Sequence, residues 1–296
     1  MSDVDARLFP GFQRRRISTG GAEINLVHGG KGPPLLLLHG YPQTHAIWHR
    51  VAPRLAERFT VVATDLRGYG DSSKPRGLPD HSNYSKRSMA LDQVEVMQHL
   101  GHDRFAVVGH DRGGRVAHRL ALDHPDRVTR LAVLDIVPTL TMYRRTTEAF
   151  ARAYYHWFFL IRPEPFPERL IGADPRFFIE QNMGSRHAGL SAFAPDAFAE
   201  YVRCFSYPEA IHASCEDYRA AASIDLEHDE ADLERKLACP LLALWGSKGI
   251  IARCFSPLSD WQERAGSVTA KALDCGHYLP EEAPDALPEE LFTFLS

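Results

Sequence analysis

Three residues that could together carry out nucleophilic catalysis occur far apart along the chain. Asp111 lies in the stretch VVGHDRGGR (107–115), between an apolar run and a segment of helical pattern. Asp135 closes the apolar run RLAVLD, and His277 follows the last apolar run in DCGHYLPEE. A carboxylate needs no activation to attack carbon, because its usual pKa of about 3.9 leaves it ionised at neutral pH. A histidine oriented by a second carboxylate could then activate water.

The small residues around Asp111 predict a nucleophile elbow, a sharp strand-to-helix turn that exposes the reactive side chain. Gly109 precedes Asp111, and Gly113 and Gly114 follow it, as expected where bulky neighbours would clash. G-x-D-x-G alone is more typical of a plain turn, but its place between two valines and a helix favours the elbow. No G-x-S-x-G occurs, so a serine nucleophile has no place. We expect His110 to pack behind the site rather than act as a base.

Residues beside the elbow could supply positive charge and backbone donors. Tyr41 lies in HGYP, directly after the apolar run PLLLL, where folds with such an elbow place one N–H of an oxyanion hole. We expect the backbone N–H groups of Tyr41 and Arg112 to form this hole. Arg112 and Arg115 are three residues apart at a helix start and therefore share a face. Each guanidinium could hold a carboxylate through two parallel N–H bonds, which suits a small anionic substrate; the alternative is a surface arginine paired with acids.

The elements that must position these residues alternate between strand and helix. The expected strands are 34–38, 60–64, 105–108, 130–136, 240–245 and 268–273, and the expected helices are 46–58, 84–100, 114–122, 256–265 and 284–295. This alternation predicts an α/β fold with a mostly parallel sheet flanked by helices. Between the two groups of strands the chain is helical or irregular and rich in aromatic residues, which indicates a helical cap inserted after the sixth strand. We divide the chain into core (1–138), cap (139–225) and core (226–296).

Bulk properties exclude several classes of function. The net charge of −4 offers no basic surface for nucleic acid, the first residues do not resemble a signal peptide, and no apolar run could span a membrane. The five cysteines are scattered without a C-x-x-C pair, so we expect a reduced, cytoplasmic protein. The acidic run 225–234 lacks ligand spacing and predicts a solvated helix face rather than a metal site. No metal or cofactor is expected, because carboxylate, imidazole and water suffice for the chemistry.

The motifs GHDRGGR, HGYPQTH, DLRGYGDSSKP, LAVLDIVPT and YHWFF resemble the fluoroacetate dehalogenase (haloacetate dehalogenase) family of the α/β-hydrolase superfamily, over about residues 9–295. The HGxP motif and the elbow are shared with epoxide hydrolases and haloalkane dehalogenases. Arg112 and the pair His156-Trp157 are more specific to the fluoroacetate dehalogenase family. The resemblance implies hydrolysis of small 2-haloacids such as fluoroacetate or chloroacetate to glycolate and halide. Asp111 would form an ester that water activated by His277 and Asp135 hydrolyses. It also implies a homodimer.

The resemblance further implies a halide site made by the cap. His156, Trp157 and Tyr218 would donate an imidazole N–H, an indole N–H and a phenol O–H to the departing halide. Without the resemblance, the aromatic stretch around His156 is more typical of a cap core. The chain departs from the family in lacking a tryptophan near Gly184 or Ser185. This predicts a roomier pocket on that side and leaves open which halogen is preferred.

Two other functions remain open from the sequence. An epoxide hydrolase would use the same Asp-His-Asp triad, with Tyr218 and either Tyr154 or Tyr155 protonating the epoxide oxygen. It has no evident use for a carboxylate clamp beside the nucleophile. A non-catalytic ligand-binding protein of the same fold is the second alternative, although the complete Asp-Asp-His set would then be idle.

Overall fold

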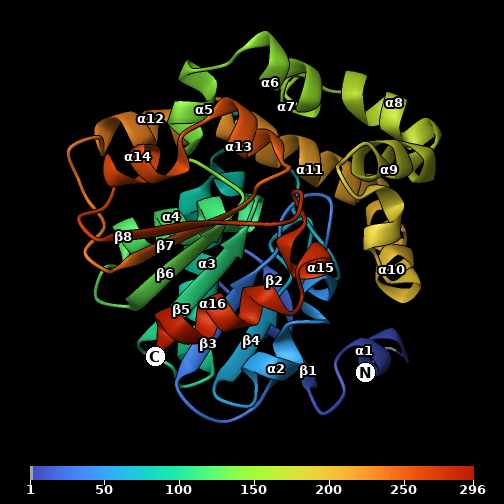
Figure 1. Ribbon diagram of the computed structural model, residues 1–296. Helices are drawn as coiled ribbons and strands as arrows, with labels where there is room; N and C mark the ends of the chain where they lie inside the picture. The colour runs from blue at the N-terminus through green and yellow to red at the C-terminus, as the bar shows by residue number, and fades with distance from the viewer. Residues whose placement is uncertain (1–2) are drawn as a thin grey trace.

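The computed structural model describes residues 3–296 and shows an eight-stranded sheet with helices on both faces (Figure 1). The strands are β1 (Gln13–Ser18), β2 (Glu23–Gly29), β3 (Pro34–Leu38), β4 (Thr60–Thr64), β5 (Phe105–His110), β6 (Val128–Leu134), β7 (Leu241–Gly246) and β8 (Val268–Leu273). Their order is β1-β2-β4-β3-β5-β6-β7-β8, with β1 and β2 antiparallel at one edge and β3 to β8 parallel. The predicted α/β architecture is confirmed. The sequence did not reveal β1 and β2.

Helices of the core cover the two faces of the sheet. They are α2 (Ala52–Leu55), α3 (Lys86–His99), α4 (Arg112–Asp123), α13 (Ile250–Cys254), α14 (Pro257–Gln262), α15 (Leu279–Glu282) and α16 (Ala286–Leu295), with the short α1 (Asp3–Leu8) near the N-terminus. Figure 1 shows α3 and α4 on one face and α2 and α16 on the other. The helix expected over 46–58 is wrong in extent: a 3-10 turn (His45–Trp48) precedes α2. Pro53 explains the break, because proline has no N–H and is tolerated only in the first turn of a helix.

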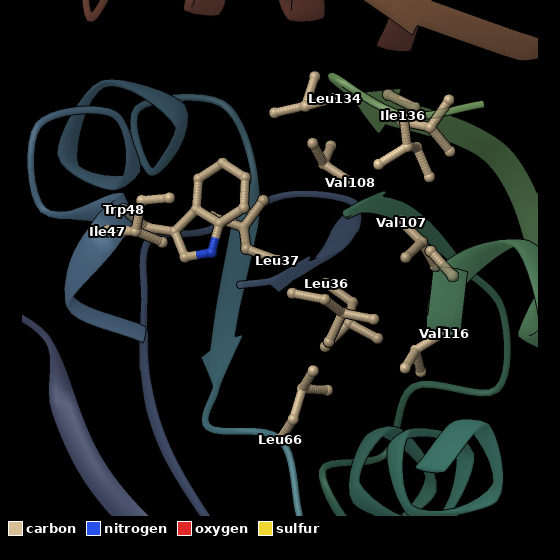
Figure 2. Close-up of a cluster of buried hydrophobic side chains, with 14 of the residues drawn as sticks. Leu36, Leu37, Ile47, Trp48, Leu66, Val107, Val108, Val116, Leu134 and Ile136 are labelled. Carbon is tan, nitrogen blue, oxygen red and sulfur yellow. The ribbon is translucent and has the colours of Figure 1, made fainter. Parts of the chain in front are cut away.

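The core of the molecule lies where β3 and β5 meet the helices, and it fixes the strand end that carries Asp111. Figure 2 shows side chains of both strands packed together with neighbours from α4 and from the segments after β3 and β6. All six residues of β5 are buried, including Val107 and Val108, which are fully inaccessible. A strand buried on both faces reads as a continuous apolar run, which is why the sequence revealed it. The rigid end of β5 therefore holds the elbow in place.

A helical insertion separates β6 from β7, as the sequence predicted. Its helices are α5 (Thr139–Arg144), α6 (Glu148–Ala153), α7 (His156–Phe159), α8 (Phe166–Ala173), α9 (Pro175–Gly184), α10 (Pro195–Phe205), α11 (Pro208–Ala221) and α12 (Ile224–Ala231), with a 3-10 turn, Gly189–Ala192, between α9 and α10. Figure 1 shows these helices in green to orange along the top and right of the sheet. Within residues 3–296, no helix has the length and apolar character needed to cross a membrane.

The acidic run 225–234 has the exposed face that the sequence predicted, with Glu227, Glu230 and Glu234 at the surface, but its three aspartates face inward. Asp225, Asp229 and Asp232 are all buried. Asp225 Oδ1 accepts a hydrogen bond of 2.8 Å from the backbone N–H of Lys86, and the Arg119 guanidinium lies 2.9 Å from Asp229 and 2.5 Å from Asp232. Cations of the core, invisible in the local sequence of the run, draw these acids inward. No cluster of metal-ligating side chains is found in the described part of the chain, here or elsewhere.

Candidate active site

The elbow places Asp111 in a strained conformation between β5 and α4. Its φ of 47° and ψ of −114° lie where a non-glycine residue is held only by its surroundings. The turn needs its glycines: a Cβ on Gly109 would approach the carbonyl oxygen of Gly113 to 2.5 Å, and one on Gly113 would approach that of His39 to 2.3 Å. The backbone N–H of Tyr41 donates to Asp111 Oδ1 over 3.0 Å. One carboxylate oxygen is therefore already fixed by a backbone donor.

His277 and Asp135 meet beside Asp111, as their places at strand ends predicted. The Nδ1 atom of His277 lies 2.6 Å from Asp135 Oδ2, and both side chains are buried. The backbone N–H of Gly246 donates to Asp135 Oδ1 over 3.0 Å, which fixes the carboxylate at the end of β7. Because Asp135 can only accept, Nδ1 carries the proton and Nε2 is left as a base. The phenol of Tyr154 lies 3.3 Å from the same Nδ1, a weaker contact than that of Asp135.

The surroundings of Asp111 keep its carboxylate ionised. Burial raises the pKa of Asp111, but nearby His277 and the guanidinium groups of Arg115 and Arg112 lower it more, to about 2. His110 packs against His277, with Nε2 2.8 Å from the backbone oxygen of His277 and ring centroids 4.7 Å apart. Burial lowers the pKa of His110 to about 3, so its ring is neutral and suits a packing role rather than that of a base.

Arg112 is fully buried and pairs with a residue that the sequence did not point to. Its Nε and Nη2 donate to the two carboxylate oxygens of Asp217 over 2.9 and 2.8 Å. Its Nη1 has no hydrogen-bond partner among the described residues. The guanidinium lies over the Tyr218 ring, 4.2 Å from the centroid. The expectation that Arg112 grips a substrate carboxylate through two parallel bonds is therefore corrected, because Asp217 already occupies that edge.

Arg115 is also buried and also keeps one nitrogen unused. Its Nη1 donates to the carbonyl of Val137 over 3.1 Å and to Thr139 Oγ1 over 3.0 Å, and Nη2 lies 2.9 Å from Met142 Sδ. Its Nε has no partner in the part of the chain that the structure describes. Burial lowers the pKa of Arg115, and the negative charge of Asp111 raises it by a smaller amount. Because Nη2 has only the contact with Met142 and Nε has none, the two-bond grip expected of Arg115 stays a prediction, unlike that of Arg112.

The cap brings the three expected halide donors together above the elbow. His156 and Trp157 come from α7 and Tyr218 from α11; the Tyr218 ring centroid lies 5.7 Å from that of His156 and 6.1 Å from that of Trp157. Trp157 Nε1 and Tyr218 Oη are buried without a partner anywhere in residues 3–296. Burial holds the pKa of His156 well below its ordinary value, so its ring is a neutral donor.

A third arginine, missed in the sequence, approaches the site from the cap. The Arg186 guanidinium stacks on the Tyr154 ring, 4.2 Å from the centroid, and Nη1 donates to the carbonyl of Ala153 over 3.2 Å. It lies directly after Gly184 and Ser185, the stretch that lacks the expected tryptophan. The only sequence signal for this cation is its place directly after the stretch that departs from the family. Tyr155, the alternative acid, is 45% exposed, whereas Tyr154 is buried.

The chain belongs to the alpha/beta hydrolase fold family, whose model matches residues 33–284. It is 50% identical to a fluoroacetate dehalogenase from Burkholderia sp over 290 residues, which are 98% of this chain and 95% of that protein. It is 36% identical to a soluble epoxide hydrolase from Corynebacterium sp. (strain C12) over 283 residues, 93% of this chain and 94% of that one. A crystal structure of an alpha/beta hydrolase from Nostoc sp PCC 7120 matches with a TM-score of 0.93 and 60% identity. The match covers 96% of this chain and 98% of the Nostoc chain.

These likenesses confirm the resemblance drawn from the motifs. Within the fold, the chain is a hydrolase of the branch that holds haloacid dehalogenases and epoxide hydrolases.

Proposed function

We propose that this protein hydrolyses small 2-haloacids, such as fluoroacetate or chloroacetate, to the 2-hydroxyacid and halide. One observation carries the proposal: four of the buried donors that have no partner among the described residues belong to side chains that the sequence predicted for the substrate and halide sites. They are Arg112 Nη1, Arg115 Nε, Trp157 Nε1 and Tyr218 Oη. Leaving a buried donor unpaired costs about 1–3 kcal/mol, so such a group is expected to serve a ligand. Two belong to cations and two to neutral aromatic side chains, which fits a substrate with a carboxylate at one end and a halogen at the other.

The first chemical step is an SN2 displacement by Asp111. Its Oδ2 attacks the carbon that bears the halogen, the carbon–halogen bond breaks, and the halide leaves with the bonding electrons. Trp157, Tyr218 and His156 donate hydrogen bonds to the halide as its charge develops. The substrate carboxylate is held between Arg112 Nη1 and Arg115 Nε, which offsets its repulsion from the negative charge of Asp111.

The second step releases the product from the Asp111 ester. His277 Nε2 takes a proton from water, and the hydroxide adds to the carboxyl carbon of Asp111. The ester carbonyl oxygen is Oδ1, which already accepts the Tyr41 N–H over 3.0 Å, and the Arg112 N–H is the second proposed donor to the oxyanion. Collapse of the tetrahedral intermediate expels the hydroxyacid oxygen, which takes the proton from His277. One oxygen of Asp111 now comes from water.

Two assays test this proposal. Halide release from fluoroacetate, chloroacetate and bromoacetate should be measurable, and a single turnover in heavy-oxygen water should place label in the Asp111 side chain. Halide release without label in Asp111 would overturn the ester mechanism, and no halide release from any haloacid would overturn the function. The proposal also includes the division into core (1–138), cap (139–225) and core (226–296), and a homodimer, for which sedimentation analysis is the test.

A second candidate, an epoxide hydrolase, is favoured by Tyr154. This tyrosine contacts His277, and it and Tyr218 flank the His156 ring, with centroids 5.4 and 5.7 Å from it. Two phenols near the nucleophile are what protonation of an epoxide oxygen requires. The two unpaired arginine nitrogens have no role in that reaction, so we rank it second. Diol formation from styrene oxide without halide release from haloacids would reverse the order.

A further inference from the structure

Asp217, on α11 of the cap, is a carboxylate with no exposure to solvent that four donor groups of the core surround. Arg112 Nε and Nη2 lie 2.9 and 2.8 Å from its two oxygens, and Nη2 also donates to the Asp217 carbonyl over 2.8 Å. The Tyr69 hydroxyl donates over 2.6 Å, and the Lys86 ammonium forms an ion pair with Oδ1. These donors come from three segments: the elbow, the loop after β4 and the start of α3. A single cap residue thus organises three parts of the core.

Asp217 is an ionised carboxylate in contact with two cations of the core. Burial raises the pKa of Asp217, but Arg112 and Lys86 lower it well below its usual range, so the carboxylate is ionised. Lys86 also lies 3.3 Å from Asp225. Two cations therefore face two carboxylates in this cluster, and Arg112 keeps Nη1 without a partner among the described residues. The guanidinium is held rigidly and still presents one directed donor.

We propose that Asp217 is the positioning residue that sets how Arg112 meets the substrate carboxylate, an inference that rests on the proposed function. A guanidinium is planar, so fixing Nε and Nη2 on one carboxylate fixes the direction of Nη1. Nη1 is the atom left without a partner among the described residues, and the guanidinium plane is further held against the Tyr218 ring. Asp217 itself touches neither substrate nor leaving group.

The test is the effect of Asp217→Asn on substrate affinity and turnover. The amide lacks the charge and one acceptor, so Arg112 loses its two-bond alignment. We expect KM for chloroacetate and the inhibition constant of acetate each to rise at least about tenfold, the equivalent of one charge-assisted hydrogen bond, with kcat within about threefold. A merely structural role would behave differently, because partial unfolding lowers kcat in proportion to the folded fraction and leaves KM unchanged.

Two further variants keep the test decisive. Asp217→Glu retains the buried charge and therefore the fold, but shifts the carboxylate by one methylene, so we expect the same rise in KM. Asp225→Asn is the matched control: it contacts Lys86 but not Arg112, and KM should stay within about twofold of wild type. If wild-type enzyme is active and KM is unchanged in Asp217→Glu and in any folded Asp217→Asn, the positioning role is wrong. If wild-type enzyme releases no halide, the proposed function fails instead.

Discussion

We expect the Tyr218 hydroxyl to destabilise the folded protein and to speed the proposed reaction. The substitution Tyr218→Phe measures these two effects separately. The residue is fully buried, and within the described residues its Oη has no partner. Removing an unpaired buried hydroxyl recovers part of a desolvation cost of about 1–3 kcal/mol. The ring remains and can still stack with Arg112 and contact Trp157. We therefore expect the free energy of unfolding to rise by about 1 kcal/mol rather than fall.

The same substitution removes one of the proposed hydrogen-bond donors to the departing halide. A hydrogen bond to a charged partner contributes about 1.5–3 kcal/mol, which corresponds to a fall of roughly 10- to 150-fold in the rate of ester formation. The effect should be larger for fluoroacetate than for bromoacetate, because fluoride leaves less readily and accepts stronger hydrogen bonds. Single-turnover fluoride and bromide release would measure the rates, and urea unfolding the stability.

Tyr201→Phe is a matched control for the same loss of an oxygen. Tyr201 is also fully buried, but its hydroxyl donates to Glu281 Oε1 over 2.6 Å. Its removal should lower the free energy of unfolding by about 1–3 kcal/mol and leave halide release unchanged. If Tyr218→Phe destabilised the protein as much as Tyr201→Phe, the phenol would not be an unpaired donor. Unchanged fluoride release in the folded Tyr218→Phe variant would refute its role at the halide.

Three other outcomes are expected. His277→Ala should accumulate the haloacid ester on Asp111, visible as a mass increase of the intact protein, whereas a binding protein would show no adduct. Because the pKa of Asp111 is lowered to about 2, its ionised form stabilises the fold above about pH 4; the stability difference from Asp111→Asn should shrink by about 2 kcal/mol as the pH falls toward 2. Burial raises the pKa of Glu281 from 4.5 to about 8, so stability should decline between these pH values as the unfolded chain ionises. Glu281→Gln should remove that decline, a gain of up to about 5 kcal/mol at pH 8 in urea unfolding; a pH-independent difference would contradict it.

The triad could be placed from the sequence because each member follows a strand of a parallel sheet. Asp111, Asp135 and His277 come after apolar runs, and the carboxyl ends of parallel strands lie at one edge. The runs before Asp111 and Asp135 are apolar because β5 is buried throughout and β6 is buried over its last four residues. By contrast, β1 reads QRRRIS and is mostly exposed at the sheet edge, so no apolar pattern marks it.

The environment of the arginines could not be predicted in the same way. Whether Arg112 is free or paired depends on where α11 docks, and no local pattern states which residue of a cap helix will face the elbow. Asp217 lies beside Tyr218 in CEDYRAA, so a carboxylate next to an expected donor was the one signal available. The acids at 225, 229 and 232 were misread for the same reason, since their cations belong to the core.

The pairing of Arg112 also explains why arginine, rather than lysine, is suited to this position. Two of its nitrogens are committed to Asp217, and a third remains for the substrate. A lysine ammonium is a single point of charge and cannot align with both oxygens of Asp217 while presenting a separate, directed donor. Under the proposed function, Arg115 adds its unpaired Nε, so two buried guanidinium groups would hold the substrate carboxylate together. Their relative placement is set by the cap for Arg112 and by the chain after β6 for Arg115.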